Sequence, residues 1–166
     1  MVDGVKREGD VICYATGFRH NEFLAPMNLT GRGGVSLRRQ WGDEPTAYLG
    51  VYVPNFPNLF CLYGLGTNLA HSSSLFFHSE FQMSHMEAIR LALISGSQCI
   101  EVRREVHDAY AEWHQREISR LVWAHPSIRH SHSKNPAGRV FTLSPWPIED
   151  YWAMTRVVDP DDYVIE

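Results

Sequence analysis

The sequence is short of cysteine, of charge of one sign and of long hydrophobic runs, and each shortage excludes a class of protein. Its three cysteines, Cys13, Cys61 and Cys99, are odd in number and widely spaced, which excludes a disulfide framework and indicates reduced, buried thiols in a cytoplasmic protein. The formal net charge is -4 and no basic run is present, so nucleic acid is not expected as a partner. Neither a signal peptide nor a segment long enough to span a bilayer is found, so no membrane association is expected.

The sequence also lacks the glycine patterns, G-x-G-x-x-G and the P-loop, that hold nucleotide phosphates. An apolar run at residues 59–63 (LFCLY) predicts a strand buried on both faces, residues 64–68 (GLGTN) predict a small-residue loop, and the serines at 72–74 supply hydroxyls that cap a long helix. This order is the usual geometry for receiving a cofactor, because backbone N–H groups and the positive end of the helix dipole point at the ligand.

What the chain does have is 44% apolar residues, enough for a core in one domain or a large piece of one. Residues 10–15 (DVICYA) predict a buried strand that Thr16 and Gly17 break. A parallel strand needs neighbours, and the residues before Asp10 are too few to supply one. We therefore expect the chain to be the back end of something larger.

The remainder predicts loops, two long helices and several short elements. In order these are a turn at 31–34 (GRGG), a strand at 35–37, a turn at 55–58, a helix at about 74–95 closed by Gly96, an edge strand at 100–102, a helix at about 104–123 ended by Pro126, a surface loop at 127–138, a strand at 139–143, a helix at 148–156 begun by Pro147, and an acidic end at 159–166 that is frayed or docked. The expected apolar faces are Phe77, Phe81, Ile89 and Leu93 on the first long helix, and Val106, Tyr110, Trp113, Leu121 and Val122 on the second. Trp41 and Tyr48 are expected as aromatic anchors beneath the loops.

Histidines tempt a metal interpretation that their spacing does not support. His71, His78 and His85 recur every seven residues, a helical rise of about 10.5 Å, which is too far for one ion. His130 and His132 with His125 could chelate a metal, but no cysteine or carboxylate lies nearby, so solvated loop histidines are favoured. The serines at 72–74 lack the strained G-x-S-x-G turn of a nucleophile, which leaves capping as their role.

Several stretches, in order, resemble the Baeyer–Villiger and related flavin-containing monooxygenases. They are residues 9–18 (GDVICYATGF), 31–34 with Leu37 and Trp41, 48–50 (YLG), 56–60 (FPNLF), 64–68 (GLGTN), Glu80-x-Gln82, Gly138-Arg139, Trp146-Pro147, and Tyr151-Trp152 with Thr155-Arg156. The resemblance runs from about Gly9 to Tyr163, with order, spacing and residue type in agreement.

The resemblance implies an α/β fold: the C-terminal part of a two-dinucleotide-binding-domain, Rossmann-like flavoprotein, with a mixed sheet remnant, two long helices and an extended tail. Residues 1–20 would end the NADP-binding domain, 21–96 would complete the FAD-binding domain, and 97–166 would form the C-terminal helical segment and tail. Enzymes of this family use NADPH to reduce FAD and transfer one oxygen atom from O2 to a ketone, amine or sulfide. Both cofactors belong to the complete enzyme, whose substrate is a small molecule.

The resemblance also assigns candidate site residues. The cofactor-binding candidates are Thr16, Gly17, Asn68, His71, Ser72, Ser74 and Leu75, and the substrate or nicotinamide side would receive His132 and Asn135. No residue here takes the family's catalytic role, because that arginine lies upstream. Two departures matter: Gly64-Leu65 replaces the usual Gly-Pro, and Ser131-His132-Ser133 replaces Ser-Trp-Tyr, which removes an aromatic surface.

Three hypotheses follow. The first is the C-terminal part of a Baeyer–Villiger enzyme that cannot turn over alone, since both G-x-G-x-x-G motifs are missing. The second is a stand-alone remnant or split-enzyme half, an interaction module whose partner is the N-terminal part of the enzyme or another copy of the chain. The third is an N- or S-oxygenating relative, which residues 31–41 and the long tail disfavour.

Overall fold

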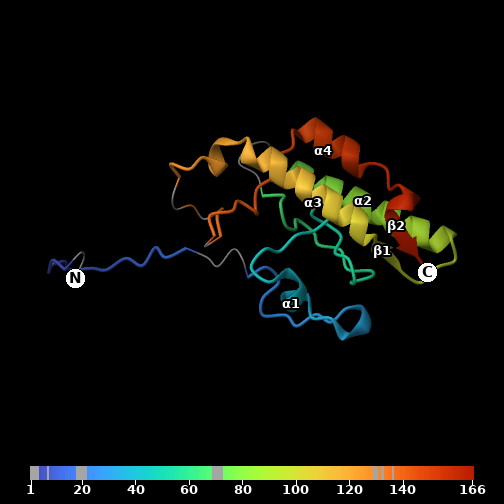
Figure 1. Ribbon diagram of the computed structural model, residues 1–166, viewed down its shortest axis with the longest axis horizontal. Helices are drawn as coiled ribbons and strands as arrows, with labels where there is room; N and C mark the ends of the chain where they lie inside the picture. The colour runs from blue at the N-terminus through green and yellow to red at the C-terminus, as the bar shows by residue number, and fades with distance from the viewer. Residues whose placement is uncertain are drawn as a thin grey trace.

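The computed structural model describes residues 4–6, 8–17, 22–68, 73–128, 131, 133–135 and 137–166. Within them it has four α-helices, two β-strands and three short 3-10 turns (Figure 1). The helices are α1 (Leu37–Trp41), α2 (Ser74–Ile94), α3 (Arg104–Ser119) and α4 (Ile148–Thr155), the strands are β1 (Ile100–Val102) and β2 (Tyr163–Ile165), and the 3-10 turns are η1 (Arg32–Gly34), η2 (Val122–Ala124) and η3 (Pro160–Asp162).

The two strands form an antiparallel pair that joins the C-terminus to the middle of the chain. Ile100 lies opposite Ile165 and Val102 opposite Tyr163, and the side chains of Ile100, Val102 and Tyr163 are buried. The strand expected at 100–102 is confirmed, and the acidic end is docked rather than frayed. The expected mixed sheet is wrong for the described residues, where the one parallel pairing is an isolated bridge between Asn68 and Leu143.

The first long helix has the expected bounds and the expected C-terminal cap. Gly96 has φ 68°, its N–H donates to Leu93 O, and the N–H of Ser97 donates to Ala92 O, which is the Schellman arrangement that glycine favours. At the other end Ser73 occupies the N-cap position, but its hydroxyl makes no capping hydrogen bond. The predicted serine cap is therefore absent at this residue.

The buried face of α2 carries small and polar side chains rather than the large apolar ones expected. Glu80, Ser84, Ala88 and Ala92 are buried at intervals of four residues, whereas Leu93 is 72% exposed. The predicted stripe is wrong at Ile89 and Leu93; the side chains of Phe77 and Phe81 lie outside the description. Small residues prevail because α4 and β1 pack directly against this helix (Figure 1), and short side chains allow the backbones to approach.

Aromatic side chains fill the main core between α2, α3, α4 and the sheet. Its buried members are Leu49, Val51, Tyr52, Ala88, Ala92, Ile100, Val102, Tyr110, Trp146, Tyr151 and Tyr163. Tyr48 meets Tyr110 edge to face at 5.3 Å, and Tyr52 meets Tyr163 in the same way at 5.1 Å, the geometry that aromatic pairs prefer. A second cluster around Leu37, Phe56 and Leu65 contacts Trp41, so the aromatic anchors are confirmed.

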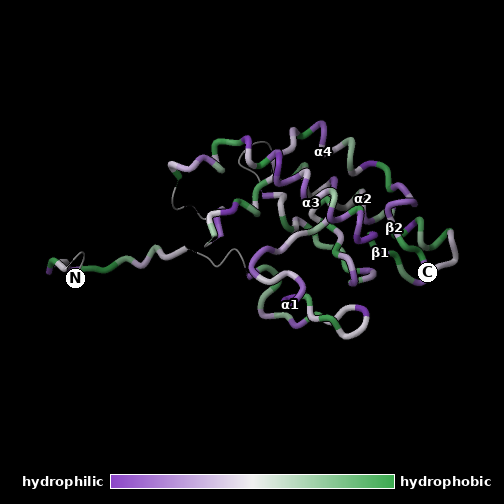
Figure 2. The backbone as a smooth tube through the Cα atoms, in the orientation of Figure 1, coloured by the Kyte–Doolittle hydropathy of each residue, from purple (hydrophilic) through white to green (hydrophobic). Residues whose placement is uncertain are grey.

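The N-terminal segment at 8–17 is extended, makes no strand and lies apart from the helices (Figure 1). Val11, Ile12 and Tyr14 are 79%, 74% and 85% exposed, and Figure 2 shows hydrophobic residues in this isolated stretch. The expected buried strand is wrong for this chain because no neighbouring strand pairs with it. Cys13 is exposed with it, while Cys61 is buried and Cys99 half-buried, so the expectation of buried thiols fails at Cys13.

Three other predicted elements differ from the structure. Residues 59–63 form no strand, because Asn58 and Tyr63 both have positive φ and turn the chain; Phe60 makes a single bridge to Tyr52. Residues 35–37 and 139–143 likewise form isolated bridges instead of strands. The second long helix ends at Ser119, and Val122 is 67% exposed.

Candidate functional site

The loop at 64–68 is closely packed at its glycines, where a side chain would meet neighbouring backbone or side-chain atoms. A side chain on Gly64 would overlap the carbonyl oxygen of Gly50. Gly66 has φ 73° and lies directly against the ring of His114. Thr67, which is fully buried, donates its hydroxyl to Gly64 O at 2.6 Å. The glycines thus fix the loop in place.

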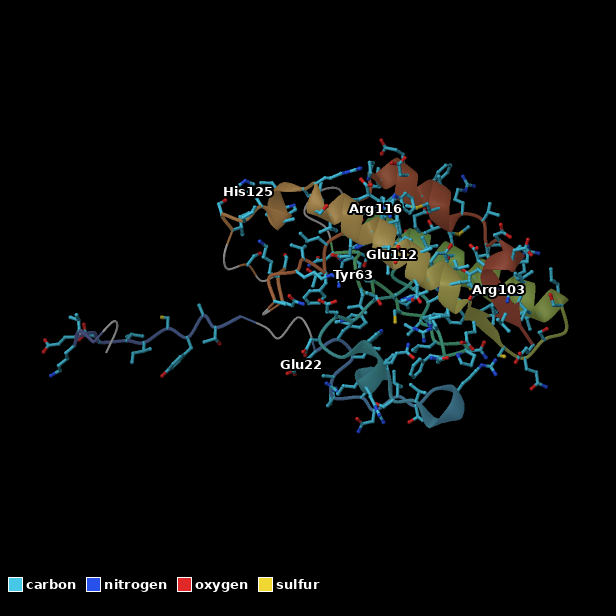
Figure 3. The ribbon with its side chains drawn as sticks, viewed as in Figure 1. Glu22, Tyr63, Arg103, Glu112, Arg116 and His125 are labelled. Carbon is cyan, nitrogen blue, oxygen red and sulfur yellow. The ribbon has the colours of Figure 1, made fainter. Side chains whose placement is uncertain are left out.

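Asn68 ends this loop with most of its polar atoms engaged. Its N–H donates to Thr142 O at 2.8 Å, and its carbonyl accepts from the N–H of Ser144 at 2.9 Å. Its Oδ1 accepts from the hydroxyl of Tyr63 at 3.0 Å; Tyr63 is labelled in Figure 3. In the part of the chain that the structure describes, the amide nitrogen Nδ2 has no partner, so Asn68 presents two oriented donors.

His114, on α3, packs against the loop at 64–68. The sequence did not predict it as a site residue. The side chain is 6% exposed, its Nε2 lies 3.2 Å from Gly66 O, and the carbonyl of Leu143 also faces the ring. Burial is the main cause that lowers the pKa of His114; the carbonyls of Gly66 and Leu143 act in the opposite direction, and nearby Arg139 lowers it further. The signal available was the spacing His107, Tyr110, His114, Ile118, which is the buried face of α3.

A cavity of about 20 Å³ lies beside His114, between α3 and the loop, and is lined among others by Tyr110, Gln115 and Arg139. It has room for about one water molecule. Its rim carries the ion pair of Arg139 with Glu44. On the outer side of α3, Glu112 and Arg116 are exposed (Figure 3).

The remaining cofactor-binding candidates are divided between two places. Leu75 lies in the first turn of α2 and is 78% exposed, and Ser74 begins the helix. Thr16 and Gly17 lie in the exposed N-terminal segment and are not brought to the loop. His71 and Ser72 lie outside the described residues.

The tail segment is tied down more firmly than a surface loop. Asn135 is buried, its N–H donates to Arg139 O at 2.9 Å, and its Oδ1 accepts from the N–H of Arg139 at 2.9 Å. Ser133 is also buried. The expectation of an open surface loop is therefore wrong here, and His132 lies outside the described residues.

Among the residues that the structure describes, no group of three or more His, Cys, Asp and Glu side chains is placed to hold a metal ion. None of the described helices has the length and apolar character needed to cross a membrane.

Two features near residues 68–74 leave hydrogen-bond donors available. Asn68 offers an oriented amide, and the first turn of α2 is left without a hydroxyl cap at Ser73, where backbone N–H groups favour negative charge.

Comparison with known proteins gives a consistent relationship. No family model matches the chain. It is 33% identical to an uncharacterized monooxygenase, y4iD, of Sinorhizobium fredii over 98% of this chain and 25% of that protein. It is 33% identical to a Baeyer-Villiger monooxygenase of Pseudomonas aeruginosa (97% and 31%) and 32% identical to the FAD-binding monooxygenase ktnD of Aspergillus niger (100% and 28%).

The fold agrees with these relatives. An oxidized steroid monooxygenase bound to NADP superposes on 83% of this chain and 26% of its own length with a TM-score of 0.72, at 23% identity. The chain spans between a quarter and a third of the curated relatives that it matches. Its homologues over nearly the whole chain are therefore Baeyer–Villiger and FAD-binding monooxygenases, and the chain corresponds to a portion of them, consistent with the C-terminal one.

Proposed function

We propose that the chain is the C-terminal part of an FAD- and NADPH-dependent monooxygenase that inserts one oxygen atom from O2 into a ketone. The observation that carries this proposal is the relationship to a Baeyer-Villiger monooxygenase over nearly the whole chain, with about a third of that protein covered. In this role residues 1–20 end an NADP-binding domain, 21–96 complete an FAD-binding domain and 97–166 form a helical segment and tail.

The role of the site follows from its donors. FAD, when bound, supplies the activation of O2. Asn68 holds an edge of the flavin ring through its Nδ2 amide, and the start of α2 at Ser74 and Leu75, preceded by His71 and Ser72, offers backbone N–H groups to negative charge on that ring. Thr16 and Gly17 join the same site when the N-terminal segment is paired. His132 and Asn135 lie on the substrate or nicotinamide side.

A second candidate, an interaction module, is favoured by two exposed apolar surfaces. One is the N-terminal segment with Val11, Ile12 and Tyr14; the other is the outer face of α2, where Met83, Met86 and Leu93 are exposed. Surfaces of this kind mark protein interfaces. The partner that fits is the N-terminal part of such a flavoprotein, because an extended segment with unpaired backbone groups can pair with a sheet edge.

The test is a hybrid enzyme. The chain is co-expressed with the portion of the Pseudomonas aeruginosa relative that it does not cover, and with nothing as control. We expect the hybrid to be yellow, with flavin absorbance, to oxidise NADPH, and to convert ketones to esters or lactones detected by mass spectrometry. The chain alone is expected to be colourless and without turnover.

The outcomes separate the candidates. Ester formation supports the proposed reaction, and N-oxides or sulfoxides without esters support the N- or S-oxygenating alternative. A stable complex that stays colourless supports the interaction module. Oxygenation by the chain alone contradicts the statement that it is only part of a working enzyme.

A further inference from the structure

His114 lies where two segments far apart in the sequence meet. The loop at 64–68 and the C-terminal segment at 142–144 are joined by the hydrogen bonds of Asn68 with Thr142 and Ser144, and by the parallel bridge between Asn68 and Leu143. The imidazole is buried beside this junction, with Nε2 3.2 Å from the carbonyl oxygen of Gly66 and the carbonyl of Leu143 also facing the ring. One ring therefore contacts a carbonyl in each segment.

The fit around the ring is close. A side chain on Gly66 would put its Cβ 2.8 Å from the Nε2 of His114, so the loop rests on the imidazole without a gap. The ring is held in turn by Tyr110 and Trp146, whose centroids are 5.9 and 6.1 Å away. Packing in the core fixes the position of the imidazole, and the ring in turn sets the position of the loop at 64–68.

We propose that His114 is a positioning residue, which sets the spacing between the loop at 64–68 and the segment at 142–144 and thereby the direction in which Asn68 presents its amide. The meaning of that direction for a flavin rests on the proposed function. The spacing itself is a property of this chain, and it is tested without any cofactor.

Three substitutions isolate the role of the ring. His114→Phe keeps a buried ring but removes every donor, whereas His114→Gln keeps N–H groups that reach a carbonyl. His107 is the matched control: it is equally buried on the same helix, two turns earlier, and bonds Thr46 Oγ1 instead. His107→Phe disturbs the core of α3 without touching the junction.

The measurement is hydrogen exchange of the backbone amides of Asn68 and Ser144 in the full chain. We expect His114→Phe to accelerate both by at least about tenfold while the Ser97 amide at the end of α2 is unchanged, because a local junction opens and not the whole fold. His114→Gln is expected to restore most of the protection, and His107→Phe to leave both amides protected.

Unchanged exchange at Asn68 and Ser144 in a folded His114→Phe protein overturns the proposal, as does an equal effect of His107→Phe. If His114→Phe does not fold, the proposal is tested on the imidazole N–H of the unsubstituted chain. One slowly exchanging ring N–H with magnetisation transfer to Gly66 or Leu143 supports the proposal, and ring nitrogens open to solvent overturn it. None of these results depends on flavin binding, so the proposed function stands or falls separately.

Discussion

Gly64 is a residue whose side chain, if it had one, would have no room. Its Cβ would overlap the carbonyl oxygen of Gly50 and lie 2.8 Å from Cβ of Cys61, and backbone contacts yield less readily than side chains. Gly64→Ala is expected to lower the free energy of unfolding by about 1–3 kcal/mol, measured by urea denaturation. Gly9→Ala is the control, since Gly9 has nothing closer than 3.9 Å. Equal midpoints for the two variants would show that the loop is looser than its contacts indicate.

The buried imidazole of His114 makes a second prediction at this scale, for pH. Burial holds the pKa of His114 below its ordinary value of 6.5, so the unfolded chain binds the proton more readily than the folded one. The stabilisation is therefore complete above pH 6.5 and is lost as the pH falls below it. Arg139 opposes the protonated ring, and Glu44, its ion-pair partner, lines the same cavity.

Unfolding free energies at pH 7.5 and pH 5 measure this effect against His114→Gln, which cannot titrate. We expect the unsubstituted chain to lose more stability than the variant over this interval. A parallel pH dependence for both proteins would assign the acid sensitivity to other groups.

At the scale of elements, tertiary packing and not the hydrophobic pattern of the sequence determines which face of α2 is buried. Ala88 is fully buried and Leu93 is 72% exposed. Ala88→Leu is expected to overpack the contact with α4 and cost about 1–3 kcal/mol, whereas Leu93→Gln is expected to stay within about 0.5 kcal/mol. Thermal unfolding of the two variants measures both, and a larger loss for Leu93→Gln would reverse our assignment of the buried face.

The same helix shows how far sequence reasoning reaches. Its length and its Gly96 cap are local properties, and both were predictable. Its buried face was not, because hydrophobicity points to Leu93 while the neighbours select Ala88 and Ala92. Hydrophobic residues on a face that this chain does not cover mislead any pattern that assumes a complete core.

The candidate site, too, could be predicted only in part from the sequence. The loop at 64–68 was recognised from its small residues and from family resemblance, and Asn68 was named from the resemblance. The buried His114 was missed, since a histidine on an amphipathic helix reads as polar surface. Its contacts are with Gly66 and Leu143, which no local pattern brings together.

For the molecule as a whole, two of the surfaces that expose apolar residues in the described chain are the N-terminal segment and the outer face of α2. Ile12 lies in the N-terminal segment and is 74% exposed, and Leu93 lies on α2. The chain corresponds to less than a third of its relatives, and in the proposed function such surfaces pack against the N-terminal part of the enzyme. Without that part, self-association is the expected substitute.

The double variant Ile12→Asp with Leu93→Asp tests this expectation by analytical ultracentrifugation. We expect the unsubstituted chain to associate with rising concentration and the double variant to remain monomeric with unchanged helical circular dichroism, because a charge at each surface opposes apolar contact. In the hybrid enzyme the same variant should lose the complex and its flavin absorbance together. Arg116→Glu, a charge change on the exposed face of α3, is the control and should alter neither. A double variant that still assembles would place the interface elsewhere on the chain and leave these two surfaces without a partner role.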